Sequence, residues 1–183
     1  MKRLAIVLGM LLVASGLVYA WSDDFTVTVT PTGNRGVIIS EASYNFGNLD
    51  TNTSAVSTSE ITVTSTGSLT GIEYTIAGDD TAQTWTLEAD GTTTPSAQDK
   101  VVLQGLFQSS AVAPSEATFG TDDTIPTATQ NVGDTDAFEG TADMDDLGLL
   151  NVSYLYMRIA TPPTSTTESQ QTYTVTINAL TAD

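Results

Sequence analysis

Alternating apolar and polar residues predict β-strands along most of the chain. In residues 172–178, Tyr173, Val175 and Ile177 alternate with threonine and asparagine, which is the period-two pattern of a half-buried antiparallel strand. Residues 152–159 carry bulky side chains at both sets of alternating positions, so we expect this strand to lie inside a sheet. A turn rich in Pro, Thr and Ser joins the two strands, and other runs of the same kind must supply their partners.

Shorter runs with the same alternation predict the remaining strands. They lie at residues 25–29, 37–39, 44–46, 61–66, 72–76, 84–89 and 101–107. Ile72, Tyr74 and Ile76 should face the core. Gly67 should supply the positive φ of a tight turn, and Gly105, which interrupts the last run, suggests a bulge.

Residues 109–146 form the longest stretch without a clear period, and they contain Pro114, Pro126 and many acids. A loop of this length is uncommon in a compact domain and is usually either functional or mobile. No segment shows a sustained helical period, and β-branched residues dominate. The sequence therefore predicts an all-β fold: a single antiparallel β-sandwich, Ig-like or jelly-roll-like, with about eight to ten strands and one long acidic loop.

The start of the chain has the pattern of a secretory signal peptide. Lys2 and Arg3 form a positive region, residues 4–17 are apolar, and residues 18–20 fit a cleavage site. A membrane span is the alternative, but the apolar run is shorter than the roughly 20 residues that a bilayer needs, and no later stretch is apolar enough to span. We therefore expect cleavage after residue 20, one β-sandwich domain over residues 21–183, and a secreted protein that is extracellular or at the cell surface.

Beyond residue 20 the chain carries all 22 acidic residues and only three basic ones, Arg35, Lys100 and Arg158, which gives a net charge of about −19 (3 − 22). This balance argues against binding to nucleic acid or to an anionic membrane surface. The chain has no Cys and no His, which excludes a Ser/His/Asp triad, a Cys/His pair and a His-based zinc site. We therefore expect a protein that is not an enzyme and that is held together by its core, by metal ions or by assembly with other copies.

A cluster of acids lies near the end of the long loop. Calcium takes about six to eight oxygen ligands on a flexible backbone, and this loop offers such ligands, although their spacing does not fit an EF-hand. A solvated acidic loop without bound metal is the alternative. The predicted ligands of a Ca2+ site are Asp134, Asp136, Glu139, Asp143, Asp145 and Asp146.

Aromatic residues offer a second candidate site. Tyr154 and Tyr156 project from the same face of one predicted strand, where they could bind a sugar ring or, equally, cover the second side of the sheet as cross-strand partners. Trp85 is more simply a core residue than a sugar-stacking platform. The tripeptides that begin at Asn52 and Asn151 match the N-glycosylation sequon.

Two sets of short motifs resemble known families. Phe46-Gly47-Asn48-Leu49 followed by residues 61–67 resembles the "FG-x-hydrophobic … I-x-V-x-N-x-G" pattern of immunoglobulin-like modules in bacterial surface proteins. The Ala-Trp-Ser-Asp start at residues 20–23 and the turn at residues 65–68 resemble secreted bacterial matrix-fibre proteins of the TasA/camelysin type. The resemblance implies an extracellular structural β-sandwich, with polymerisation through donated N-terminal strands as a further expectation.

These patterns favour a non-enzymatic extracellular structural protein, a subunit of a fibre, pilus or surface layer that forms a homo-oligomer or polymer. A strand at the start of the mature chain can pair within its own sheet or add to the sheet of a neighbouring copy. Phe25, Val27 and Val29 form the predicted assembly strand. The alternative is a cell-surface binding module or adhesin that recognises a glycan or a protein through residues 109–146 and the tyrosine pair. A hydrolase that relies on carboxylates alone is the least favoured interpretation.

Overall fold

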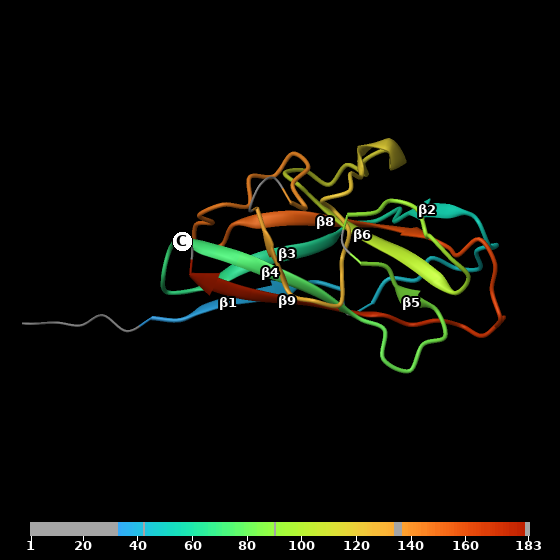
Figure 1. The fold of residues 1–183 in the computed structure, drawn as a ribbon. Coiled ribbons are helices and arrows are strands. Elements are labelled where there is room, and N and C mark those ends of the chain that lie inside the picture. Colours follow the sequence, from blue (N-terminus) through green and yellow to red (C-terminus); the bar gives the residue numbers. More distant parts are fainter. Residues whose placement is uncertain (1–32, 42, 90, 134–136, 182–183) are drawn as a thin grey trace, which may run out of the picture. The chain divides into compact units, whose positions relative to one another are not determined.

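Figure 1 shows the fold in a computed structural model, which describes residues 33–41, 43–89, 91–133 and 137–181. These residues form nine strands in two sheets and one short 3-10 helix, η1 (Glu116–Thr118). The predicted all-β class and strand number are confirmed. The strands are β1 (Arg35–Ile39), β2 (Ser54–Val56), β3 (Ile61–Gly67), β4 (Ile72–Asp79), β5 (Thr86–Leu87), β6 (Lys100–Gln108), β7 (Gln130–Val132), β8 (Val152–Ala160) and β9 (Thr174–Thr181).

Among the residues that the structure describes, no helix is long and apolar enough to cross a membrane.

The two sheets differ in size and in strand direction. The larger sheet has the order β1-β3-β8-β6-β5, and β2 pairs with the part of β8 that β3 leaves free. The smaller sheet has the order β7-β4-β9. Every named pair is antiparallel except β5 with β6, so the larger sheet is mixed and the prediction of purely antiparallel pairing is wrong at this pair. The physical reason is the long connection at residues 88–99, since a parallel pair needs a crossover of about a dozen residues or more.

Strand β8 is the centre of the larger sheet. It pairs with β6 on one side and with β3 and β2 on the other. All of its residues from Leu155 to Ala160 are buried. This confirms the prediction that a strand with bulky side chains on both faces lies inside a sheet.

Strand β9 belongs to the smaller sheet, where it pairs with β4 along its whole length. The Pro/Thr/Ser-rich connection at residues 161–173 therefore carries the chain from one sheet to the other. The predicted alternation in β9 is confirmed, because Ile177 is buried while Thr176 and Asn178 are exposed. The period-two pattern identified the strand, but it could not identify its partner.

The main core is built from side chains of both sheets. Ile72, Tyr74 and Ile76 of β4 are buried as predicted, each with at most 1% of its surface exposed. The centroid of the Tyr74 ring lies 6.4 Å from that of Phe107 on β6, so this aromatic pair connects the smaller sheet to the larger one. Burial of such apolar surface is the dominant favourable term in folding.

The long acidic segment is partly ordered against the larger sheet. It contains η1 and β7, and its Phe119 packs with Leu106 and Tyr156 in a second, smaller apolar cluster. The prediction of one long loop therefore missed β7, whose three residues are too few to show a period.

Two other local predictions differ from the structure. Residues 44–46 form no strand, and the rings of Tyr44 and Phe46 instead contact edge to face with centroids 4.8 Å apart. Gly105 forms no bulge, since β6 pairs with β8 in a continuous register. It is required for space, because a Cβ there would lie 3.2 Å from side-chain atoms of both Ile125 and Leu155.

The predicted positive φ at Gly67 is confirmed, although Gly67 is the last paired residue of β3 and not part of a tight turn. It gives a first test of the fold. Gly67 has a φ of +123°, and a Cβ there would lie 2.1 Å from the carbonyl oxygen of Asn34. We expect Gly67→Ala to lower the free energy of unfolding by about 1–3 kcal/mol, because the new side chain strains the backbone. Gly148→Ala is the matched control, since no atom lies within 4 Å of its Cβ position, and it should change stability by no more than about 0.5 kcal/mol. Urea unfolding measures both, and equal effects would contradict this account of the backbone at Gly67.

Candidate functional site

Four of the six predicted calcium ligands lie within the described residues: Glu139, Asp143, Asp145 and Asp146. The Glu139 carboxylate accepts a hydrogen bond from the Met144 amide at 2.7 Å, and the Asp143 carboxylate accepts one from the Asp145 amide at 3.1 Å. Within the described ranges, no three or more acidic side chains converge as a metal site would require. Asp134 and Asp136 lie outside those ranges, so calcium binding by the full set stays a prediction.

The other candidate residues fall in three places. The predicted assembly strand lies outside the described residues: Phe25, Val27 and Val29. Tyr156 is 1% exposed and packs against Phe119, and Tyr154 is half-buried beside this cluster. A sugar could therefore stack on both tyrosines only if Phe119 moved away. Asn52 and Asn151 of the two sequons are both exposed.

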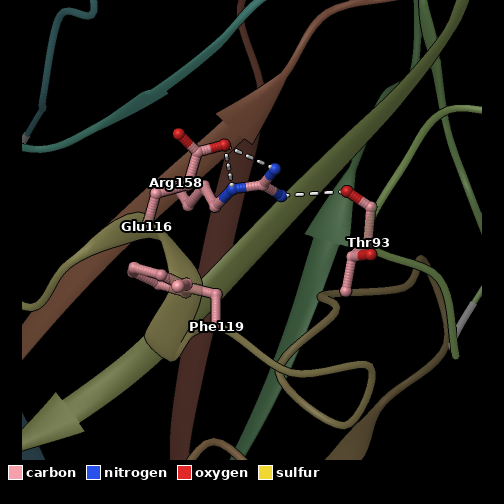
Figure 2. Close-up of a pocket in the computed structure, with 5 residues that line it drawn as sticks. Thr93, Glu116, Phe119 and Arg158 are labelled. Carbon is pink, nitrogen blue, oxygen red and sulfur yellow. Dashed lines mark hydrogen bonds and ion pairs between the residues drawn. The ribbon is translucent and has the colours of Figure 1, made fainter.

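Arg158 on β8 is buried and is the centre of a polar cluster (Figure 2). Its guanidinium donates from Nε and Nη2 to one oxygen of the Glu116 carboxylate, at 3.2 and 2.9 Å. It also donates from Nη1 to the Thr93 carbonyl at 2.9 Å and to Oε1 of Gln104 at 2.5 Å. Gln104 lies opposite Arg158 in the ladder between β6 and β8. These partners offset the high cost of burying a charged group.

Gln104 extends this cluster into a longer series of hydrogen bonds beneath the acidic segment. Its side chain is fully buried, and its Nε2 donates to the Gly120 carbonyl at 2.5 Å. The Gly120 amide in turn donates to the Asp123 carboxylate at 2.6 Å. We call the series Glu116–Arg158–Gln104–Gly120–Asp123 the polar chain. It fastens the acidic segment to the two central strands of the larger sheet.

The outer end of the polar chain is an ionised acid beside a cavity. Hydrogen bonds from the Ser54 hydroxyl and then from Arg158 hold the pKa of the Glu116 carboxyl below its ordinary value. The cavity has a volume of about 410 Å³ and is lined by Thr93, Glu116, Ala117, Phe119 and Arg158. Because Glu116 neutralises the guanidinium, and Thr93 and Gln104 occupy its inner donors, the cavity presents no uncompensated charge of Arg158 to a ligand.

The inner end of the polar chain is a buried acid. Asp123 is 3% exposed, and burial raises the pKa of its carboxyl to about 7, although hydrogen bonds from the backbone of Gly120 and Phe138 act in the opposite direction. The negative charge of Asp122 adds to the rise. The two acids at the ends of the polar chain therefore titrate in different pH ranges.

A different feature lies where the two sheets meet. Within the part of the chain that the structure describes, β1 pairs only with β3, and β9 pairs only with β4. The two strands nevertheless lie side by side (Figure 1), with Cα atoms that approach within 8 Å. We call this unpaired boundary the β1/β9 seam.

The backbone groups of β1 that do not bond to β3 can be assigned from the alternation of an antiparallel ladder. The Ser40 amide donates to the Thr62 carbonyl in the register of β1 with β3, so the even-numbered residues of β1 bond to β3. The N–H and C=O groups of Val37 and Ile39 therefore point into the seam.

The same reasoning applies to β9. Ile72 of β4 exchanges both backbone hydrogen bonds with Leu147, so the odd-numbered residues of β4 bond to the even-numbered residues of β9. The backbone groups of Val175, Ile177 and Ala179 therefore point into the seam.

The side chains at the seam belong to the edge of the core. Val37, Val175 and Ala179 pack against the core but remain partly exposed. In the described part of the chain, the seam therefore combines backbone groups that join no ladder with apolar side chains that are only partly covered.

The polar chain was not predicted from the sequence, apart from the placement of Arg158 and Gln104 on strands. Gln104 carried the clearest signal, because a polar residue inside an apolar strand needs a hydrogen-bonding partner. That partner could not be identified without the register of β6 against β8. Asp123 carried no signal that separates it from the other acids of the segment.

Comparison of the chain with protein-family models, with curated proteins and with solved structures finds no match.

The polar chain makes a testable prediction about stability. We expect Gln104→Leu to lower the free energy of unfolding by about 2–4 kcal/mol. The substitution removes the hydrogen bonds that the Gln104 amide makes to the Gly120 carbonyl and to Nη1 of the buried Arg158. The matched control is Gln98→Leu, the same substitution at an exposed glutamine, which should change stability by no more than about 0.5 kcal/mol. Chemical denaturation of both variants measures the difference. A Gln104→Leu protein as stable as Gln98→Leu would show that the buried amide does not fasten the segment.

Proposed function

We propose that this chain is a secreted, non-enzymatic structural protein, a subunit of a fibre, pilus or surface layer whose copies join by β-strand addition. The observation that carries the proposal is the β1/β9 seam. Two neighbouring strand edges whose outer backbone groups join no ladder within the described residues are a template for pairing with another strand. The partly exposed core residues at the seam would be covered by the apolar face of such a strand.

The occupant that we propose is the N-terminal strand of a second copy. Phe25, Val27 and Val29 alternate with threonines, so a strand formed by these residues has one apolar face. That face matches Val37 and Val175 at the edge of the core. Placing a strand between β1 and β9 requires their separation to widen from within 8 Å to about 9.6 Å, which is twice the spacing of paired strands.

Deletion of residues 23–30 from the mature chain tests the proposal directly. We expect the truncated protein to keep its core fold, measured by circular dichroism and thermal unfolding, and to lose all filaments or sheets in negative-stain electron microscopy. A synthetic peptide of residues 23–32 should bind to the truncated protein, whereas a peptide with Pro in place of Val27 should not. Filaments that persist after the deletion would overturn strand donation.

Point variants separate the donated strand from the rest of the N-terminal segment. Phe25→Asp should abolish assembly because it places a charge on the apolar face of the strand. Thr26→Asp adds the same charge to the opposite face and should leave assembly within about threefold of the wild-type rate, measured by light scattering. Equal loss in the two variants would indicate a charge effect and not strand pairing.

A second pair of variants tests the receiving edge. Val37→Pro removes an N–H group that points into the seam, so it should block assembly while the core stays folded. Ile38→Pro removes an N–H group that bonds to β3, so it should reduce the stability of the core itself. If Val37→Pro assembles normally, strands do not add at β1.

Charge gives a further expected outcome. Subunits with a net charge of about −19 (3 − 22) repel one another, and salt screens this repulsion because the Debye length falls from about 30 Å at 0.01 M to about 3 Å at 1 M. We expect assembly to accelerate about tenfold or more over this range. Calcium and magnesium chloride at equal ionic strength should then act alike. A response to calcium alone would instead identify the predicted acidic site as a working one.

A protein that is monomeric at every salt and calcium concentration would favour the alternative, a cell-surface binding module or adhesin. The same outcome would follow if the N-terminal strand closes the seam of its own copy. The peptide experiment separates the binding module from a monomer that closes its own seam. After deletion of residues 23–30, the added peptide should bind only if the seam normally accepts the N-terminal strand.

A further inference from the structure

One edge of β6 is covered mostly by irregular chain, without a full neighbouring strand. The amide of Gly105 donates to the Asp123 carbonyl at 2.9 Å, and the amide of Ile125 donates to the Leu103 carbonyl at 2.8 Å. These bonds occupy the side of β6 that faces away from β8. Residues 119–125 thus take the place of an edge strand.

A second piece of the same segment continues this covering. The amide of Phe107 donates to the Phe138 carbonyl at 2.9 Å, and the amide of Gly140 donates to the Phe107 carbonyl at 2.9 Å. We call residues 119–125 and 137–142 together the β6 cover. It hides a strand edge that would otherwise be open to another strand.

Asp123 holds the two pieces of the β6 cover together. Its carboxylate accepts the amide of Gly120 from the first piece, at 2.6 Å, and a backbone hydrogen bond from Phe138 in the second piece. Its own carbonyl is the acceptor for Gly105 of β6. Through Gly120 the same carboxylate is connected to the rest of the polar chain.

No positive charge among the described residues pairs with the ionised carboxylate of Asp123. Asp122 brings a second negative charge. Among the described residues, no basic side chain forms a salt bridge with Asp123. The Glu139 carboxylate, on the second piece of the cover, is bonded to the Met144 amide. Arg158 is already paired with Glu116 and is separated from Asp123 by two members of the polar chain.

We propose that the polar chain is a latch for the β6 cover and that loss of the Asp123 proton releases it. While Asp123 is neutral, its burial between the two pieces of the cover carries no charge penalty. Once Asp123 is ionised, conformations in which water reaches its carboxylate are favoured. Water can reach it only when the cover separates from β6. The edge that becomes free presents the backbone groups of Leu103, Gly105 and Phe107.

The direction of the pH dependence follows from proton linkage. Burial raises the pKa of Asp123 to about 7 in the closed state, while the open state has the ordinary value of about 3.9, so the closed state binds more protons between these values. The cover is therefore held most firmly below about pH 4. Its opening becomes up to tenfold more favourable with each pH unit between about 4 and 7, and changes little above that range.

Hydrogen exchange at single-residue resolution on the full-length chain tests the latch, with rates corrected for the intrinsic effect of pH. The amides of Gly105 and Phe107 report on the cover, while those of Gln104 and Leu106 face β8 and serve as controls within the same strand. We expect the protection of Gly105 and Phe107 to fall at least tenfold between pH 4.5 and 7.5 while that of the controls stays constant. A parallel change in all four amides, or a change in none, would overturn the proposal.

Two variants identify the titrating group. Asp123→Asn cannot ionise, so the protection of Gly105 and Phe107 should no longer depend on pH. Asp122→Asn removes the neighbouring charge and should retain the dependence. If Asp123→Asn still loses protection at high pH, or if Asp122→Asn no longer does, Asp123 is not the group whose ionisation releases the cover. Should Asp123→Asn fail to fold, the comparison of amides within wild-type β6 decides the question alone.

Discussion

The ladder between β6 and β8 is the interaction on which the rest of the structure depends. Its register pairs Gln104 with Arg158 and Leu106 with Tyr156, and the side chains on both faces of the two strands are largely buried. One face packs against the smaller sheet, and the other carries the polar chain and the smaller apolar cluster. A shift of one residue would exchange the two faces. The same register therefore determines the core, the polar chain and the position of the acidic segment.

In the described part of the chain, the edge of β6 is hydrogen-bonded to irregular chain, whereas the edges at the β1/β9 seam are not. The edge of β6 is closed by backbone hydrogen bonds to residues 119–125 and 137–142, which block pairing there. At the β1/β9 seam, in contrast, two edges lie close together and are joined by no ladder within the described residues. Within the described residues, irregular chain covers the edge of β6, whereas no ladder joins β1 to β9. The proposed function therefore places strand addition at the seam and not at β6.

Much of the fold could be predicted from the sequence because side-chain alternation is a local property. It identified β8 as an interior strand and placed Ile72, Tyr74 and Ile76 in the core, both of which the structure bears out. The partners of β8 and β9 could not be predicted, since alternation says which face is buried and not which strand lies beside it. The two strands lie in different sheets although they follow one another in the chain.

The polar chain could not be predicted for a related reason. Gln104, Gly120 and Asp123 meet only because the acidic segment folds back over β6, and no local pattern signals such a return. Gly105 illustrates the same limit. The sequence suggests a bulge at this glycine, but its role is to leave room for Ile125 and Leu155, which are distant in the chain. The predicted calcium ligands and the assembly strand stay predictions.

The alternation at the β1/β9 seam also determines how a joint made there would respond to a pulling force. If a strand of residues 25–29 occupies the seam, sliding by one residue turns Thr26 and Thr28 toward the core in place of Phe25 and Val27, while sliding by two restores an apolar face. Such a joint resists small displacements and then yields in increments of two residues, about 6.6–6.8 Å. A filament built on it would dissipate mechanical work in discrete slips and would not stretch like a uniform spring.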